Sequence, residues 1–203
     1  MSAEEELQEA PRAPVEHRTA VVTDVSFPDR TVELIVMPYE REAIVRHEGR
    51  VIREVCSRGA YDGIERRANR VRVNRDHDVT RTIGRAIAFH PSREVGLVAE
   101  LRIARTDLGE ETLTLADEGL LDASAGFAPM PGGVEWEGRQ LRRLTKVWLA
   151  HIAMTPDPAY VDANVLAVRT AEPGSELQPV SATPRLDEVR AWLATTRYDR
   201  AGR

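Results

Sequence analysis

The feature that most constrains the fold is a long series of short segments rich in β-branched residues, spread over the middle of the chain. The clearest pair covers residues 20–25 and 32–36, and the segment between them contains Pro28 and Asp29, which favour a turn. Similar patterns predict strands at residues 43–46, 51–55, 71–74, 82–89, 96–103, 124–128, 141–154 and 165–168. Residues 84–89 and 96–101 flank a proline-containing stretch at 91–94, which predicts a hairpin.

Only two segments of the middle region predict helices, at residues 61–68 and 106–118. The second has Thr106 or Asp107 as its candidate N-cap, Glu110 after the cap and Gly119 at its end. Many strands with few helices and no alternation of strands with helices favour an antiparallel barrel or sandwich over a doubly wound sheet. We therefore predict a mainly β fold with a few helices.

The 203 residues divide by composition into four parts. Residues 1–17 are acidic and poor in large apolar groups, so we expect them to be disordered. Residues 18–169 carry nearly all the strand patterns and form the predicted barrel domain, and residues 170–184, rich in Pro, Ser and Thr, form a predicted linker. In the tail at 185–203, apolar residues at helical spacing predict a short helix at 185–197, which either docks on a partner or lies against its own domain.

Composition excludes several classes of function. A net charge of -5 argues against a surface for nucleic-acid phosphates, and an aromatic content of 5% argues against a base-stacking surface. No run of apolar residues is long enough to span a membrane, and the acidic N-terminus does not resemble a signal peptide. The single cysteine, Cys56, cannot form an internal disulfide, which fits a reducing cytoplasm.

Residues 124–128 are the most informative stretch for chemistry, because Ser124 is surrounded by small residues that let another backbone approach its hydroxyl. A serine needs an adjacent base to become a nucleophile. His77, between two aspartates after a predicted strand, and His151, within an apolar strand, are the candidate imidazoles.

Each of these residues also has an ordinary explanation. Ser124 could be only a small residue tolerated beside a glycine, and His77 a solvated turn residue. His151 needs a hydrogen-bond partner once buried, either a backbone carbonyl or a catalytic imidazole that it orients. The remaining histidines, His17, His47 and His90, lie in no such setting and were not assigned a role.

Two other kinds of site are disfavoured. A zinc site built from Asp76, His77 and Asp78 with His151 or His90 would need neighbouring strand residues to share one metal, although they point to opposite faces. The chain has no His-x-x-x-His or Cys-x-x-Cys spacing, so we expect neither a metal nor a cofactor. Residues 122–126 lack the first glycine of the α/β-hydrolase nucleophile elbow, and no helix pattern follows them.

Four segments, in this order along residues 20–168, resemble elements of one family, and it is their order that makes the match specific. They are Arg58-Gly59-Ala60-Tyr61, Asn74-Arg75-Asp76-His77-Asp78 followed by Thr82-Ile83-Gly84, the glycine- and serine-containing residues 118–127, and the closing residues 148–160 with their Pro-Ala ending. Together they resemble the HK97-like prohead (capsid maturation) proteases of tailed bacteriophages, which are related in fold to the herpesvirus assemblins. The resemblance implies an antiparallel β-barrel and a serine endopeptidase.

The resemblance also implies roles for the matching residues. Ser124 would be the nucleophile, His77 the general base and His151 the third member, while the amide of Ala125 or the loop after His151 would supply the oxyanion hole. Many phage members look to have glutamate at the third position, in a Glu-Val-Ser pattern, whereas this chain has histidine, as the herpesvirus enzymes do. A second imidazole can orient His77 but offers no full negative charge, so we expect a slow enzyme.

The implied substrates are the major capsid protein and its scaffold segment, cut inside the assembling prohead in the host bacterial cytoplasm by a homodimeric enzyme. The chain would also cut itself, and the predicted linker at 170–184 is a candidate self-cleavage region. The sequence is also compatible with two other functions. One is a catalytically inactive capsid-assembly or scaffolding protein that uses the barrel for binding. The other is a serine esterase or amidase acting on a small molecule, which the low aromatic content disfavours because it would need a deep apolar pocket.

Overall fold

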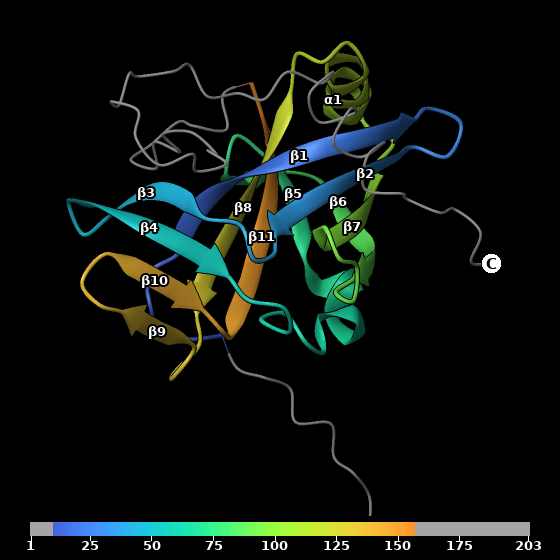
Figure 1. Cartoon of the computed structure of the whole chain (residues 1–203). Coiled ribbons are helices and arrows are strands. Elements are labelled where there is room, and N and C mark those ends of the chain that lie inside the picture. Colours follow the sequence, from blue (N-terminus) through green and yellow to red (C-terminus); the bar gives the residue numbers. More distant parts are fainter. Residues whose placement is uncertain (1–9, 157–203) are drawn as a thin grey trace, which may run out of the picture.

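The computed structural model describes residues 10–156, which form a closed β-barrel with a smaller sheet beside it (Figure 1). Around the barrel the strands follow the order β1-β2-β7-β6-β5-β11-β8. Their bounds are β1 (Glu16–Ser26), β2 (Thr31–Pro38), β5 (Arg72–Arg75), β6 (Asp78–His90), β7 (Gly96–Ile103), β8 (Asp122–Pro129) and β11 (Val147–Thr155). The predicted mainly β barrel is confirmed, as is the hairpin, formed by β6 and β7.

The barrel is mixed rather than purely antiparallel, because β5 and β11 pair in parallel. Parallel neighbours end at the same edge of a sheet, so the turn after β5 lies beside the end of β11. The backbone N–H of Asp76 in that turn donates to the carbonyl of Met154 at 3.0 Å. This pairing brings the region of His77 to β11.

The second sheet has the order β3-β4-β10-β9, with bounds β3 (Ala43–His47), β4 (Arg50–Cys56), β10 (Leu141–Leu144) and β9 (Val134–Glu137). The prediction of one strand over residues 141–154 is wrong, since these residues form β10 in the second sheet and β11 in the barrel. Between them the amides of Thr145 and Lys146 both donate to the carbonyl of Gly133, at 2.9 and 3.3 Å. These bonds follow the last residue pair of β10 with β9, Leu144 with Val134, and end that strand pairing. Strand β9 was not predicted.

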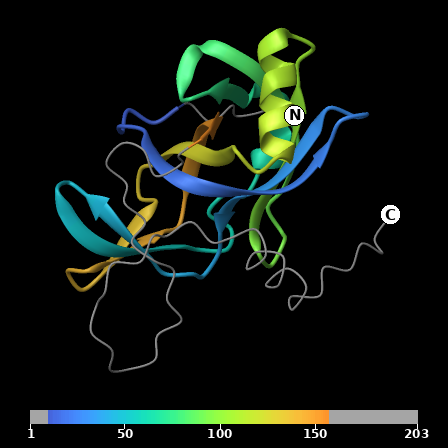
Figure 2. The same ribbon diagram turned by 90° about the horizontal axis from the view of Figure 1, so that it is seen from above.

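Two helices accompany the sheets. The α-helix α1 (Asp107–Asp117) confirms the second predicted helix, and its N-cap Thr106 accepts a hydrogen bond from the amide of Gly109 at 3.1 Å. The helix η1 (Ile64–Arg70) is of the 3-10 type and begins three residues later than predicted, after Gly63 with its positive φ of 84°. Seen from above, α1 lies on the side of the barrel away from the second sheet (Figure 2). No helix within residues 10–156 is both long and apolar enough to cross a membrane.

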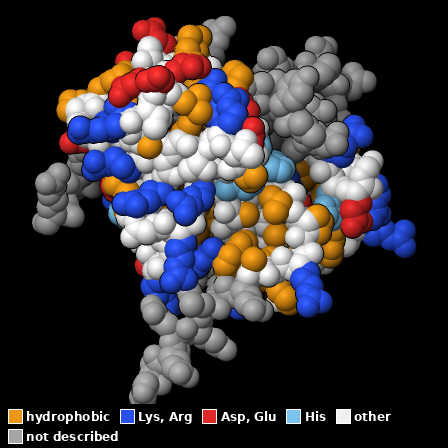
Figure 3. Space-filling model, turned by 180° about the vertical axis from the view of Figure 1, so that it is seen from behind, with side chains coloured by type: hydrophobic (Ala, Val, Ile, Leu, Met, Phe, Trp, Pro, Cys, Tyr) orange, Lys and Arg blue, Asp and Glu red, His pale blue; other side chains and the backbone are white. Residues whose placement is uncertain are grey.

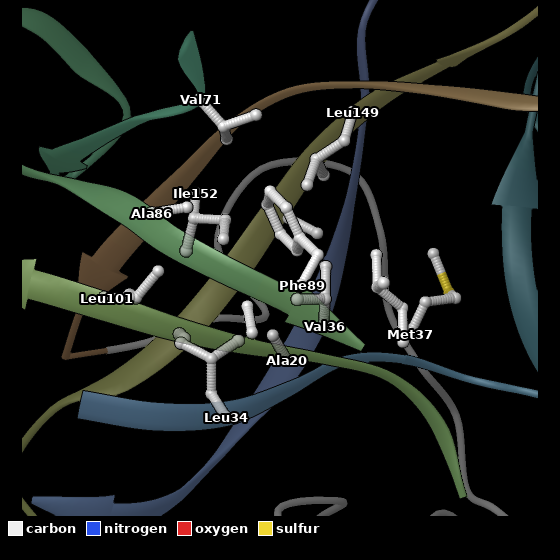
Figure 4. Close-up of a cluster of buried hydrophobic side chains, with 14 of the residues drawn as sticks. Ala20, Leu34, Val36, Met37, Val71, Ala86, Phe89, Leu101, Leu149 and Ile152 are labelled. Atoms are coloured by element: carbon white, nitrogen blue, oxygen red, sulfur yellow. The ribbon is translucent and has the colours of Figure 1, made fainter. Parts of the chain in front are cut away.

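The barrel interior is filled by aliphatic and aromatic side chains from all around the sheet (Figure 4). On β8 the inward residues are Ala123, Ala125 and Phe127, each completely buried. Side chains alternate between the two faces of a strand, so Ser124 and Gly126 lie on the outer face. Packing of Ala123, Ala125 and Phe127 in the core therefore places the Ser124 side chain on the outside of the barrel.

A buried group of charged residues, the ion network, joins the second sheet to the barrel. Its members are Glu16 and Arg18 on β1, Glu54 on β4 and Arg142 on β10. Glu54 accepts from Arg18 Nε at 2.7 Å and from Arg142 at 2.9 Å, and Glu16 accepts from Arg142 at 2.7 Å and from Arg18 at 2.8 Å. Every charge is matched, which buried ions require.

Several predictions concern residues at the two ends of the chain. Strand β1 begins at Glu16, so the last two residues of the predicted N-terminal segment at 1–17 belong to the barrel sheet. The predicted strand at 165–168, the linker at 170–184 and the tail at 185–203 with its helix lie outside the described residues.

Candidate active site

The outer face of β8 lies between β1 and β11 and carries two rows of facing residues. Ser124 is paired with Thr19 on one side and Ala153 on the other. In the next row Gly126 is paired with His17 and His151. Directly paired residues present their side chains on the same face, so the two histidines flank Gly126 and Ser124 is their diagonal neighbour.

Gly126 makes room for the His151 ring. A Cβ atom at this position would lie 2.6 Å from His151 Nε2 and 2.8 Å from its Nδ1, closer than side chains tolerate. Any other residue would push the ring away from β8. The glycine of the predicted serine motif is thus explained by the imidazole on the neighbouring strand.

His77 reaches the same face from a two-residue turn. Arg75 of β5 pairs with Asp78 of β6, and Asp76 and His77 form the loop between them with φ of 54° and 59°. Positive φ at both central residues is the signature of the tight hairpin turn that matches the twist of strands, and Asp and His tolerate it better than most residues. The Asp76 carboxylate is held by Arg81 at 3.0 Å, which further fixes the turn.

The structure brings His77 and His151 into direct contact. Nδ1 of His77 lies 2.8 Å from Nε2 of His151, a hydrogen bond between two neutral rings in which one nitrogen donates and the other accepts. The bond occupies Nδ1 of His77 and leaves its Nε2 for another partner. This is the arrangement expected when one residue orients the base of a serine nucleophile.

His17, for which the sequence predicts no role, belongs to the same group. Its ring centroid lies 4.1 Å from that of His77 in an edge-on arrangement and 5.7 Å from that of His151. We call His17, His77 and His151 the histidine cluster. Strand alternation in β1 could have separated His17 from Glu16 and Arg18, but only the long-range pairing of β1 with β8 places it in the cluster.

Burial and mutual repulsion keep the cluster neutral. Burial lowers the pKa of His77 first, the charges of His17 and His151 lower it further, and Asp76 only partly opposes them, which leaves the pKa at about 4. Burial also lowers the pKa of His17 and of His151. At neutral pH all three rings are therefore uncharged, and His77 is able to accept a proton.

Ser124 lies on this face, and its side chain is completely buried. Its Oγ makes no hydrogen bond to any residue between 10 and 156, so no bond joins it to His77. Diagonal neighbours across an antiparallel pair have Cα atoms about 7–8 Å apart, within reach of long side chains. Ser124 thus shares the face of the histidines without being bonded to them.

The predicted oxyanion-hole donors lie within the sheet. Ala125 is paired with Arg18 on β1 and with Ile152 on β11, so its amide belongs to a strand with neighbours on both sides. His151 is followed by strand residues as far as Thr155 rather than by a loop. Asp122 occupies the outer face two residues before Ser124, and burial raises the pKa of its carboxyl.

The histidine cluster is also the group of described residues best placed to hold a metal ion, rather than the aspartates considered from the sequence. One nitrogen from each ring lies within 4.8 Å of the others. Imidazole nitrogens bind zinc at about 2.0–2.1 Å, which in a tetrahedral site puts two of them about 3.3 Å apart. The 2.8 Å separation of His77 and His151 is shorter, and is that of a hydrogen bond.

The surroundings of the cluster differ in character on its two sides. Figure 3 shows the histidine side chains in the middle of one face, with hydrophobic side chains next to them and Lys and Arg side chains gathered on the other side. An extended segment lying over the histidines would therefore meet apolar groups on one side and positive charge on the other.

The family model described as caudovirus prohead serine protease matches residues 40–176, two thirds of the chain. The chain belongs to the caudovirus prohead serine protease family. It is a peptidase of phage capsid maturation, as the sequence resemblance implied. No curated protein and no solved structure matched the chain in the corresponding comparisons.

The matched region contains His77, Ser124 and His151, whereas His17 precedes it. Membership of the prohead protease family implies capsid or scaffold proteins as substrates.

Proposed function

We propose that the chain is a serine endopeptidase that cuts scaffold and coat-protein segments during head maturation, with Ser124 as nucleophile and His77 as general base. The observation that carries this proposal is the 2.8 Å contact between His77 Nδ1 and His151 Nε2 on the face that bears Ser124. His151 is the residue that orients His77. In this assignment Nδ1 of His77 is bonded to the orienting residue, and its Nε2 is left to accept the serine proton, as a serine–histidine pair requires.

In the proposed reaction, Ser124 Oγ attacks the scissile carbonyl carbon while His77 Nε2 takes the hydroxyl proton. The resulting tetrahedral intermediate collapses when His77 gives that proton to the leaving amine, and an ester to Ser124 remains. Water then attacks the ester with His77 again as base, which releases the acid and restores the hydroxyl. Ala125 N–H remains the candidate oxyanion donor, and requires a local shift of β8 out of its ladder.

The electrostatics of the cluster favour a slow enzyme. A proton on His77 places a positive charge in a half-buried site beside two other imidazoles, and no carboxylate of residues 10–156 forms an ion pair with it. The low pKa of His77 keeps the base free but makes the imidazolium costly in the transition state. Slow cutting suits a protease that acts only after a shell has assembled.

The proposal extends to the setting of the reaction. We place the enzyme in the host bacterial cytoplasm, inside the assembling prohead, as a homodimer that also cuts its own chain. Size-exclusion chromatography with light scattering tests the dimer directly, and a monomer at working concentration would contradict it.

The decisive experiment combines labelling and processing. A fluorophosphonate probe should label the wild-type protein and not Ser124→Ala, while Ser92→Ala, an exposed serine in the turn between β6 and β7, should label normally. Co-expression with the adjacent coat protein should yield cleaved coat protein with the wild type and with Ser92→Ala only. Cleavage that persists in Ser124→Ala would remove the proposed nucleophile.

One observation favours a second candidate function. The Ser124 hydroxyl is buried and unbonded among residues 10–156, as it would be in a capsid-assembly protein that keeps the barrel for binding alone. That candidate predicts no labelling by the probe and unchanged head assembly in Ser124→Ala. Particle yield measured by electron microscopy, together with gel analysis of the coat protein, separates the two.

A further inference from the structure

A row of three arginines begins beside the histidine cluster and crosses the barrel. His151 on β11 is paired with Arg72 on β5, Arg72 with Arg85 on β6, and Arg85 with Arg102 on β7. Directly paired residues present their side chains on the same face. The arginine row, which we define as Arg72, Arg85 and Arg102, therefore continues the outer-face row of His151.

No carboxylate of residues 10–156 neutralises the charges of the arginine row. All three side chains are exposed, and none is paired with a carboxylate within residues 10–156. Glu100, on the same strand and face as Arg102, is instead bonded to His90 at 2.8 Å. Among the described residues the row is thus a positive surface without counter-charges.

Such a row is costly for the sheet. Like charges directly opposite each other on neighbouring strands destabilise the pair, and here the repulsion acts twice in succession. Several other arginines are paired with carboxylates: Arg18 and Arg142 bind Glu54 and Glu16, and Arg143 binds Glu137 at 2.7 Å. The arginine row differs from these pairs in lying next to the candidate active site, which indicates a ligand that supplies negative charge there.

The dimensions of the row fit an extended peptide. Neighbouring strands lie about 4.7–4.9 Å apart, so the three arginines span about 10 Å. That is the length of about three residues of extended chain at about 3.3 Å each. Arg66 and Arg70 belong to η1, which contacts β6, and are also without a carboxylate partner among the described residues.

We propose that Arg72, Arg85 and Arg102 form a subsite that binds acidic side chains of the substrate, on one side of the bond to be cut. This inference rests on the proposed function and names its substrate class: scaffold or coat segments with a cluster of Asp and Glu residues near the cut. Arginine suits this role because its planar guanidinium binds carboxylates in a fixed two-point geometry. A nucleic acid fits the row less well, because no aromatic side chain stands in it to stack on bases.

The test uses the full chain carrying Ser124→Ala, so that binding is measured without cutting. The probes are a short fluorescein-labelled peptide with glutamate at alternate positions and the same peptide with glutamine, followed by fluorescence anisotropy. We expect the glutamate peptide to bind more tightly, and Arg72→Gln/Arg85→Gln/Arg102→Gln to weaken it by about tenfold or more, as three exposed charge pairs allow. Added salt should weaken binding to the parent protein more than to the triple variant.

The control removes the same charge elsewhere. Arg46→Gln/Arg50→Gln/Arg53→Gln takes three exposed arginines from the second sheet and should leave the affinity within about twofold, because these side chains are remote from the row. Equal binding of the two peptides, or equal loss in both triple variants, would overturn the subsite. So would a single-stranded oligonucleotide that displaces the glutamate peptide and binds more tightly than it, which would assign the row to nucleic acid.

The two proposals fail in different ways. If the otherwise wild-type triple variant is still labelled by the fluorophosphonate probe and cuts glutamate and glutamine substrates with unchanged kcat/KM, the subsite is wrong and the peptidase stands. If no protein is labelled but the glutamate peptide still binds through the row, the nucleophile is wrong and the acidic-segment surface stands.

Discussion

Two polar clusters share strand β1 and differ in how their charges are balanced. The ion network uses Glu16 and Arg18, and the histidine cluster uses His17 between them, because successive residues of a strand point to opposite faces. In the ion network every buried charge meets an opposite charge within 3 Å. In the histidine cluster three titratable rings lie together, and no carboxylate of residues 10–156 forms an ion pair with them.

The electrostatic consequences also differ. Burial opposes the charge on Arg18, but Glu54 and Glu16 outweigh it and raise the pKa of the guanidinium, which fixes the ionised state. Burial and neighbouring rings instead lower the pKa of His77 and leave it neutral. A matched cluster stabilises the fold, whereas an unmatched cluster keeps a group ready to change its protonation state.

The largest effect is expected from the proposed base, His77. His77→Gln should lower proteolytic kcat/KM by about 10²–10⁴-fold, because the proton acceptor is lost. Circular dichroism and thermal unfolding should be close to those of the wild type. His90→Gln, which removes a half-exposed histidine bonded to Glu100, should retain activity, and a similar loss in both variants would argue against a specific role for His77.

The next largest effect should appear in stability rather than activity. Glu54→Gln removes one of the two carboxylates that Arg18 and Arg142 share, and we expect a loss of about 3–5 kcal/mol in the free energy of unfolding, measured with urea. Glu42→Gln breaks an exposed pair with Arg53 and should cost less than about 1 kcal/mol. Equal costs would mean that the ion network does not hold the second sheet to the barrel.

A smaller effect on activity is expected from Gly126, against which the His151 ring packs. Gly126→Ala introduces a methyl group where the His151 ring lies, and a displaced orienting residue should cost about 10²-fold in kcat/KM. The imidazole signals of His77 and His151 in NMR spectra should shift as well. In Gly49→Ala the new methyl group meets no atom within 4 Å, so the strain of its positive φ should affect stability alone.

The smallest effect is a shift in pH dependence. With His77 as the proposed base its neutral form is the active one, so kcat/KM should fall only as the pH drops through about 4, and should be nearly flat between pH 5 and 8. Removing the neighbouring ring in His17→Gln takes away one cause of the low pKa and should move this limb to higher pH. An acid limb near 6.5 in the wild type would contradict the proposed environment of His77.

The sequence predicts these elements unevenly, for physical reasons. Strand β7 and helix α1 are bounded by glycine, proline or an N-cap, which act locally, and both are found where expected. The break between β10 and β11 has no such residue, because it depends on a carbonyl of Gly133 from another segment.

In the site, too, local sequence patterns do not reveal contacts between distant segments. His77 and His151 could be singled out from their flanking residues, and the structure brings them together. His17 lies among charged residues and enters the cluster only through the pairing of β1 with β8. The arginine row is likewise invisible in the sequence, since its members are far apart and meet only by register.

The parallel pairing of β5 with β11 has a kinetic consequence. Ser124 faces Ala153, and the turn of His77 is bonded to Met154, so the chain that continues after Pro156 is tethered within a few residues of the proposed nucleophile and base. A short tether gives a segment of the same chain a high effective concentration at the site. Cutting of that segment should then be first order, with a half-time that does not change on dilution, whereas cutting of a separate scaffold protein should slow in proportion.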